Sequence, residues 1–229
     1  PWADLPELVT SEVVTTAIWL SVLTSVASAG VALVLGVPLA WILARLEFPG
    51  RRLLRAVVTL PMVLPPVVGG AALLFALGRR GLIGEPLYEA TGFLLAFSAW
   101  GVIVANSFVA LPVLVITVEA AMEQADTRYA RAAATLGADR LTVFRRVTLP
   151  TIAPAIRAGL VLAWARALGE FGATVTFAGS LEGRTRTLPL TVFVALESDR
   201  DTAVAVSLVM VVIAVIVLTT MRDRWWQRP

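Results

Sequence analysis

The chain has 229 residues, of which 58% are hydrophobic and only 15% are charged, and its mean hydropathy is +0.84. Soluble domains contain about 45–50% apolar and about 25% charged residues, so this composition excludes an ordinary soluble domain. All 19 basic residues are Arg, and the sequence has no Lys, His or Cys. It therefore predicts no disulfide framework, no thiol nucleophile and no transition-metal site.

The few charges are clustered, which leaves long stretches without Asp, Glu or Arg. These stretches are residues 13–44, 56–78, 90–118 and 202–221. Each is at least as long as the roughly 20 apolar residues that span a bilayer. A fifth stretch, at about 158–176, is similar but contains Arg166 and Glu170. We therefore predict an all-α polytopic membrane protein with five transmembrane helices and a membrane domain covering residues 13–221.

The distribution of Arg predicts how these spans are oriented. If five spans alternate, the regions 45–55, 119–157 and 222–229 share one side of the membrane. That side then holds thirteen Arg against five on the other, which makes it cytoplasmic by the positive-inside rule. Residues 1–12 are expected outside and the tail 222–229 inside the cell membrane. Because an exported N-terminus without a leader is unusual, we expect that a sixth, N-terminal helix is missing. The sequence pI of about 10.5 reflects these Arg-rich loops, and no nucleic-acid partner is expected.

The second span contains a run of helix-disrupting residues. Pro61, Pro65 and Pro66 in LPMVLPP are followed directly by Gly69 and Gly70. Proline lacks the backbone N–H that a helix interior requires, so the span is expected to be kinked or to contain irregular backbone. A bend needed only for packing and a bend beside a transport pathway are both compatible with this pattern.

The segment 126–150, DTRYARAAATLGADRLTVFRRVTLP, is more than a simple loop. Asp126 or Thr127 can cap a helix, Gly137 permits a turn, and a second short helix then carries Leu141 and Phe144. One interpretation is an amphipathic helix held on anionic lipid by its Arg residues. Because its apolar face is mostly Ala, a helix that docks on another protein fits better.

The same segment resembles the cytoplasmic signature of the permeases of ABC importers. The positions that match this signature are Ala132, Ala133, Gly137, Leu149 and Pro150. The family usually opens the motif with Glu, where this chain has Arg131. The resemblance implies that these residues, with Ala138 and Phe144, form coupling helices that dock on a separate ATPase. The chain has no G-x-x-x-x-G-K-[ST] loop, so it is not expected to be an enzyme, and ATP and Mg would bind to the partner.

Other motifs resemble the permease subunit of molybdate ABC transporters over nearly the whole chain. They are LGVPLAWILAR at 35–45, LPMVLPPVVGG at 60–70, ARALGEFGATVTFAG at 165–179 and GRTRTLPL at 183–190. Sulfate permeases share a related GE(F/Y)G core, and these residues do not separate tungstate from molybdate. The resemblance implies a homodimer, two ATPase subunits and an external molybdate-binding protein. That protein is expected to contact the outer loop at Arg184, Thr185, Arg186 and Thr187.

Arg166 and Glu170 lie within an apolar span. Arg166 is nine residues from Arg157 at the end of the span, hence about 13–14 Å deep if the helix is regular. A charge at this depth costs at least about 2.5–3.5 kcal/mol, so both side chains should face protein or water. The pair is a structural ion pair, an attractive site for a dianion, or part of a gate. We expect the pathway residues to be Arg166, Gly169, Glu170, Gly172, Thr174 and Thr176. A secondary transporter using the pair as a proton relay is the alternative from another class, and it leaves the segment 126–150 unexplained.

Overall fold

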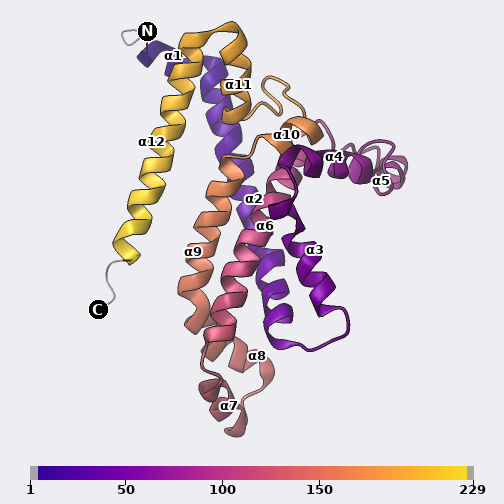
Figure 1. The fold of residues 1–229 in the computed structure, drawn as a ribbon, viewed down its shortest axis with the longest axis vertical. Helices are drawn as coiled ribbons and strands as arrows, with labels where there is room; N and C mark the ends of the chain where they lie inside the picture. The colour runs from indigo at the N-terminus through magenta and orange to yellow at the C-terminus, as the bar shows by residue number, and fades with distance from the viewer. Residues whose placement is uncertain (1–4, 226–229) are drawn as a thin grey trace.

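The structure, a computed structural model, describes residues 5–225 and contains only helices within that range (Figure 1). The helices of the first half are α1 (Leu5–Thr10), α2 (Glu12–Arg45), α3 (Arg51–Val63), α4 (Pro66–Leu77), α5 (Gly84–Thr91) and α6 (Ala99–Gln124). Those of the second half are α7 (Thr127–Thr135), α8 (Arg140–Val143), the π-helical turn η1 (Phe144–Thr148), α9 (Leu149–Leu168), α10 (Gly172–Phe177), α11 (Leu188–Ser198) and α12 (Arg200–Trp225). The outermost residues of the predicted end segments, 1–4 and 226–229, lie outside the described part.

Within the described residues, four helices are long and apolar enough to cross a membrane. They are α2, α6, the continuous helix Arg140–Leu168 that ends with α9, and α12 from Arg200 to Thr219. A fifth span exists if α3 and α4 are counted together, although they are bent by 120° at a short break. The prediction of an all-helical polytopic membrane protein is confirmed, and the five predicted spans correspond to these four helices and the bent pair.

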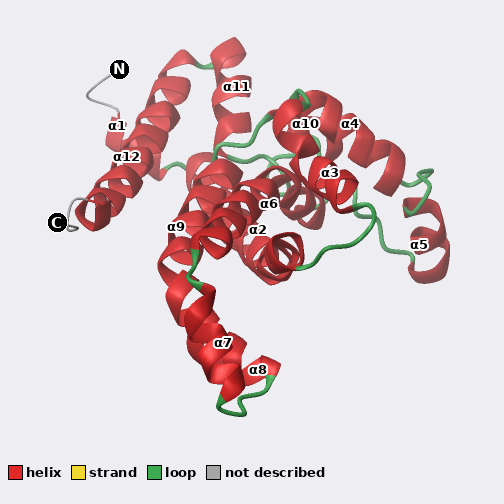
Figure 2. Ribbon diagram, turned by 60° about the horizontal axis from the view of Figure 1, so that its bottom comes forward, coloured by secondary structure: helices red, strands yellow, loops and turns green. Residues whose placement is uncertain are grey.

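The centre of the bundle is made by α2, α6 and α9, which pack along one another (Figures 1 and 2). The buried face of α2 carries small side chains, including Ser25, Ser28 and Gly36. A Cβ atom at Gly36 would lie 3.1 Å from the side chain of Leu114, so this face lets α6 approach closely. The Ser28 hydroxyl also donates to the carbonyl oxygen of Ile103 on α6, at 3.0 Å. Small residues and interhelical hydrogen bonds therefore hold the bundle together.

Two of the predicted spans have different limits in the structure. The third was expected to begin near residue 90, but α6 begins at Ala99, where the Ser98 hydroxyl accepts a hydrogen bond from the N–H of Gly101 at 3.1 Å. The fifth was expected as one helix over about 158–176. The helix instead ends at Leu168, and α10 is a separate short helix. Hydropathy does not detect either boundary, because the residues beyond it are as apolar as the helix itself.

The segment 178–201 was expected to be an outer loop, but half of it is the helix α11. Its apolar stretch is too short to span a bilayer, so the search for long uncharged stretches did not detect this helix. The helix packs against α12 and α2 and buries Leu188 and Leu190. The N–H of Leu188 donates to the hydroxyl of Ser21 on α2 at 2.7 Å, which fixes the start of α11 to the bundle.

Candidate functional site

The span that contains Arg166 and Glu170 is broken between the two residues. α9 ends at Leu168 with Gly169 as its cap, so Glu170 lies beyond the helix end rather than one turn further along it. A guanidinium nitrogen of Arg166, Nη1, is 2.6 Å from Oε2 of Glu170. The Glu170 side chain is 1% exposed and that of Arg166 is 38% exposed. The expected ion pair is therefore present, but it crosses a helix break. Its Glu170 member is buried, and its Arg166 member is exposed at the surface of the chain.

Glu170 has a second role that sequence reasoning missed. Its other carboxylate oxygen, Oε1, accepts a hydrogen bond from the backbone N–H of Ala173 at 2.8 Å. This N–H belongs to the first turn of α10, where no helical partner is available. A buried carboxylate at this position also carries the charge that a helix N-terminus favours. Glu170 thus joins the last turn of α9, through Arg166, to the first turn of α10.

The predicted hydroxyls of α10 are engaged within the chain. Thr174 is fully buried, and its hydroxyl donates to Oδ1 of Asn106 on α6 at 3.1 Å. Thr176 donates to the carbonyl oxygen of Gly172 within α10, at 2.8 Å. In this conformation neither hydroxyl proton points to an open site. Asn106 was not expected in the site, and a lone Asn in an apolar run was the signal that could have found it.

The break at α9–α10 lies directly against the break at α3–α4. α3 ends at Val63 and α4 begins at Pro66, as the run of proline residues predicted. A Cβ atom at Gly70 of α4 would lie 2.7 Å from the carbonyl oxygen of Ala173, and one at Gly172 would lie 2.9 Å from the Cβ of Pro66. Only glycine allows the two helices to approach so closely. The two irregular membrane segments therefore form one junction, the broken-helix junction, at which Arg166 and Glu170 lie.

The segment 126–150 forms two short helices at one end of the molecule, below α6 and α9 in Figure 1. The turn between them is a Schellman motif, in which the N–H of Ala138 bonds to the carbonyl of Ala133 and the N–H of Gly137 to that of Ala134. Gly137 has φ +90° and no atom within 4 Å of where a Cβ would be. The turn predicted at Gly137 is present, its glycine has a left-handed conformation, and the space beside it is open.

Both short helices of this segment are capped at their starts, and the turn between them exposes an apolar side chain. Asp126 accepts a hydrogen bond from the N–H of Arg128 at the start of α7. Asp139 similarly caps α8, where hydrogen bonds from the side chain and backbone of Thr142 lower the pKa of its carboxyl below the ordinary value. Leu136 is 88% exposed at the turn, although a side chain of this type is usually buried. Sequence reasoning did not single out Leu136 as a contact residue.

The remaining residues of the signature matched in the sequence lie at the start of the following span. Phe144 begins η1, and Leu149 and Pro150 open α9. Phe144 and Leu149 are half-buried and Pro150 is exposed, while Ala132 is exposed on α7. The residues of the signature therefore extend from the two short helices into the first turn of a membrane helix.

The loop before α11, which was expected to be an outer loop, is compact. The hydroxyl of Thr185 accepts from the N–H of Leu181 at 2.9 Å and donates to the carbonyl of Gly179, and Thr185 itself is fully buried. Arg186 forms an ion pair with Glu182 at 2.9 Å. Thr187 is also buried, whereas Arg184 is exposed. The two Thr residues thus shape the loop, and Arg184 and Arg186 reach its surface.

Comparisons with known proteins agree with this architecture. Residues 36–227 match the family described as binding-protein-dependent transport system inner membrane component. The chain is 52% identical over 198 residues to the molybdenum transport system permease protein ModB of Mycobacterium bovis, covering 86% of this chain and 75% of that protein. It is 44% identical over 184 residues to the protein of the same name from Escherichia coli, covering 79% and 80%.

A sulfate permease and a solved ABC transporter are similar to this chain at lower sequence identity. The sulfate transport system permease protein CysT of Salmonella typhimurium is 37% identical over 196 residues, covering 86% of this chain and 70% of that protein. The fold resembles the crystal structure of a bacterial alginate ABC transporter in complex with an alginate pentasaccharide-bound periplasmic protein. The TM-score is 0.73 at 22% identity, covering 98% of this chain and 83% of that one. At this identity the likeness shows the fold alone.

Proposed function

The chain belongs to the family of binding-protein-dependent transport system inner membrane components, and we propose that it is the membrane-spanning subunit of an ATP-driven importer of molybdate. The broken-helix junction is the observation that carries a transport role, because irregular backbone at membrane depth is tolerated only where protein or a water-filled cavity surrounds it. The identity to relatives named as molybdenum permeases, which exceeds that to a sulfate permease, supports molybdate as the substrate. Sulfate and tungstate are the alternatives within this class.

The pathway runs between two copies of the chain, beside Arg166. Its side chain is more than a third exposed within an apolar span, and a charge that faced lipid there would cost about 2.5–3.5 kcal/mol or more. Facing a second copy, it lines a path for a dianion. Glu170 neutralises part of its charge, so that an anion is attracted without being held too tightly for release. Gly169, exposed at the end of α9, leaves room beside the guanidinium.

The end that carries α7 and α8 is cytoplasmic in this proposal, and the C-terminus lies on the same side, because the Arg residues concentrate there. Two ATPase subunits, which bind ATP and Mg, dock on the segment 126–150. The external binding protein delivers molybdate to the outer loop at Arg184 and Arg186. The chain itself contributes conformational switching between two states rather than covalent chemistry. A secondary transporter would need no ATPase and would leave the exposed helices α7 and α8 without a role.

The proposal is tested with the subunit reconstituted in liposomes with its ATPase and binding protein. Molybdate should enter only with ATP, and Gly137→Leu should abolish substrate-stimulated ATP hydrolysis because its side chain fills the open turn. A side chain at φ +90° also strains the backbone by about 1–2 kcal/mol. Gly92→Leu is the matched control, since Gly92 also has a positive φ of +69° and no atom within 4 Å.

Two further comparisons sharpen this test. Gly137→Asn, which tolerates the left-handed conformation, should retain more coupling than Gly137→Leu. Sulfate at equal concentration should compete poorly with molybdate. Full ATPase stimulation in Gly137→Leu would exclude the segment 126–150 as the coupling element, and uptake without ATP would favour the secondary transporter.

A further inference from the structure

One buried charge of the bundle takes no part in the broken-helix junction. Glu119 lies near the end of α6, and its side chain is only 7% exposed. An ionisable side chain buried in a membrane span is costly unless it is paired. The carboxylate of Glu119 is paired with the guanidinium of Arg55, which belongs to α3. The pair therefore joins two different helices at a point where the carboxylate has little access to water.

The other ionic contacts between these two helices are more exposed. Glu123, one turn further along α6, is 49% exposed. It lies 3.3 Å from the guanidinium of Arg55 and 3.7 Å from that of Arg51. Exposed ion pairs contribute little, because water competes for both charges. The buried carboxylate of Glu119 is thus the main ionic attachment of α3 to α6.

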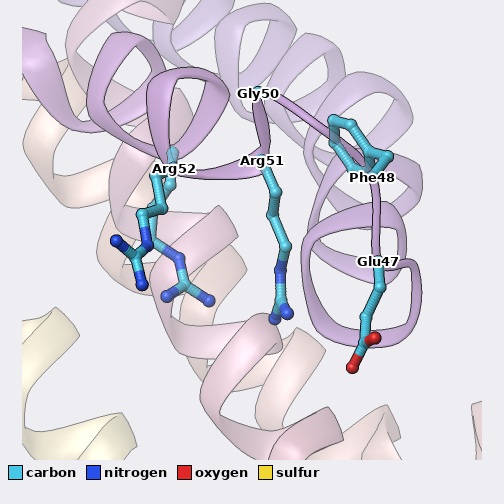
Figure 3. A pocket seen from close by; sticks show the side chains of 6 residues that line it. Glu47, Phe48, Gly50, Arg51 and Arg52 are labelled. Carbon is cyan, nitrogen blue, oxygen red and sulfur yellow. The ribbon is translucent and has the colours of Figure 1, made fainter.

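Packing holds α3 only weakly. Of its 13 residues, all within the described part of the chain, Val58 alone is buried. Apolar side chains of its second half, such as Leu60 and Val63, are exposed. At its start, the corner with α2 contains a hollow of about 460 Å³ that is lined by Glu47, Phe48, Gly50, Arg51, Arg52 and Arg55 (Figure 3). A helix with so few buried apolar contacts depends on its strong polar contacts for its position.

Both helices of the pair continue directly into parts of the proposed transport machinery. α6 is followed after a short connection by α7, the first helix of the segment 126–150. α3 continues through the proline break into α4, which packs against α10 at Gly70 and Gly172. Coupling between distant sites is carried by rigid elements and by the ion pairs and packed side chains that connect them. The pair of Arg55 and Glu119 connects the two elements that lead to these two sites.

We propose that Glu119 is a positioning residue for transport. Its pair with Arg55 makes α3 follow α6, so that a movement of the segment 126–150 reaches the broken-helix junction through α3 and α4. Without the pair, α6 would shift while α3 stayed behind. The attachment of α3 is inferred from its contacts, whereas its use in coupling rests on the proposed function.

The first test compares amide exchange in α3 between the wild-type chain and Glu119→Leu, both purified in detergent. Leu is close to Glu in volume and suits a buried position, and Arg55 is 46% exposed, so water replaces its lost partner. The melting temperature should therefore change little. Exchange in α3 should become about tenfold faster, which is the effect of losing one hydrogen bond between charged groups. Unchanged exchange would overturn the proposal whatever the transported substrate is.

Glu123→Leu is the matched control, because it makes the same substitution one turn further along the same helix. Its carboxylate faces the same guanidinium but is exposed. Exchange in α3 should stay within about twofold of the wild-type value, as expected for the loss of an exposed pair. Equal acceleration in the two variants would assign the effect to surface charge and would overturn the role of the buried pair.

The second test uses the subunit reconstituted in liposomes with its ATPase and binding protein. Glu119→Leu should still assemble and hydrolyse ATP, but the molybdate taken up per ATP hydrolysed should fall at least about fivefold, the lower end of coupling between distant sites. The double variant Arg55→Glu with Glu119→Arg should recover most of this ratio, because it restores an ion pair between the same two helices.

Two results separate this proposal from the others. A pair that served stability alone would lower the amount of assembled complex and leave the ratio of uptake to hydrolysis unchanged in Glu119→Leu, and that result would overturn the coupling role. Absence of ATP-dependent molybdate uptake in the wild-type protein would instead contradict the proposed function. The exchange measurement would still decide whether Glu119 fixes α3.

Discussion

Replacing Glu170 with Gln tests the broken-helix junction most directly, because the two carboxylate oxygens make two interactions of different kinds. One oxygen forms an ion pair with a guanidinium nitrogen of Arg166 at 2.6 Å, and the other accepts a hydrogen bond from the N–H of Ala173 at 2.8 Å. An amide has only one acceptor. If its oxygen faces Ala173, its NH₂ group faces the guanidinium, donor against donor. If it is turned around, the NH₂ group faces the backbone N–H instead.

The expected loss of stability is modest. A hydrogen bond to a charged group contributes about 1.5–3 kcal/mol. The Arg166 side chain is 38% exposed, so water and screening recover part of the lost ionic interaction. Removing a charge from a side chain that is 1% exposed also relieves a desolvation penalty. We expect a net destabilisation of about 1–2 kcal/mol, seen as a fall of a few degrees in the melting temperature of the purified protein.

The double variant Arg166→Gln with Glu170→Gln separates the structural from the functional role. The second amide supplies an acceptor for the first, so the stability lost in Glu170→Gln should largely return. If Arg166 lines the pathway, molybdate uptake should stay low in the double variant although the protein is stable. Recovery of uptake together with stability would assign the pair to packing alone. An unchanged melting temperature in Glu170→Gln would refute the capping argument itself.

Three further predictions concern other parts of the chain. Gly70→Val should destabilise the protein by about 1–3 kcal/mol, because its Cβ would lie within 3 Å of the α10 backbone; Gly30→Ala, with no atom within 4 Å, should not lower the melting temperature. A single Cys in place of Gly183 should react with an impermeant thiol reagent in intact cells and one in place of Arg140 should not, and the reverse pattern would invert the proposed orientation. Because the pKa of Asp139 is lowered in the folded protein, its contribution to α8 is complete above the ordinary pKa of 3.8 and is lost as the pH falls through the folded value. Amide exchange at the start of α8 should therefore be slow at neutral pH and faster in Asp139→Ala, and equal exchange in both proteins would show that the cap is unimportant.

Local patterns were sufficient to predict the number of membrane segments and the turn at Gly137. Uncharged stretches of 20 or more residues predict spans regardless of the helices that pack against them, because a segment can cross a bilayer if it is long and apolar enough. A glycine between two short helical patterns needs no tertiary partner to adopt a left-handed conformation. The break before Pro66 was likewise visible in the sequence, since proline removes a helical donor wherever it occurs.

The role of Glu170 was decided by tertiary structure. Hydropathy predicts one continuous helix through Arg166 and Glu170, because the residues on both sides are apolar. The helix ends at Leu168 because α4 and α10 pack closely at Gly70 and Gly172, and because the carboxylate of Glu170 accepts a hydrogen bond from the N–H of Ala173. Whether a backbone N–H deep in a membrane protein is bonded within its own helix or to a carboxylate depends on which groups the packed fold brings within about 3 Å. No spacing along the chain contains that information, since the glycine that opens this space lies about a hundred residues away from the carboxylate that uses it.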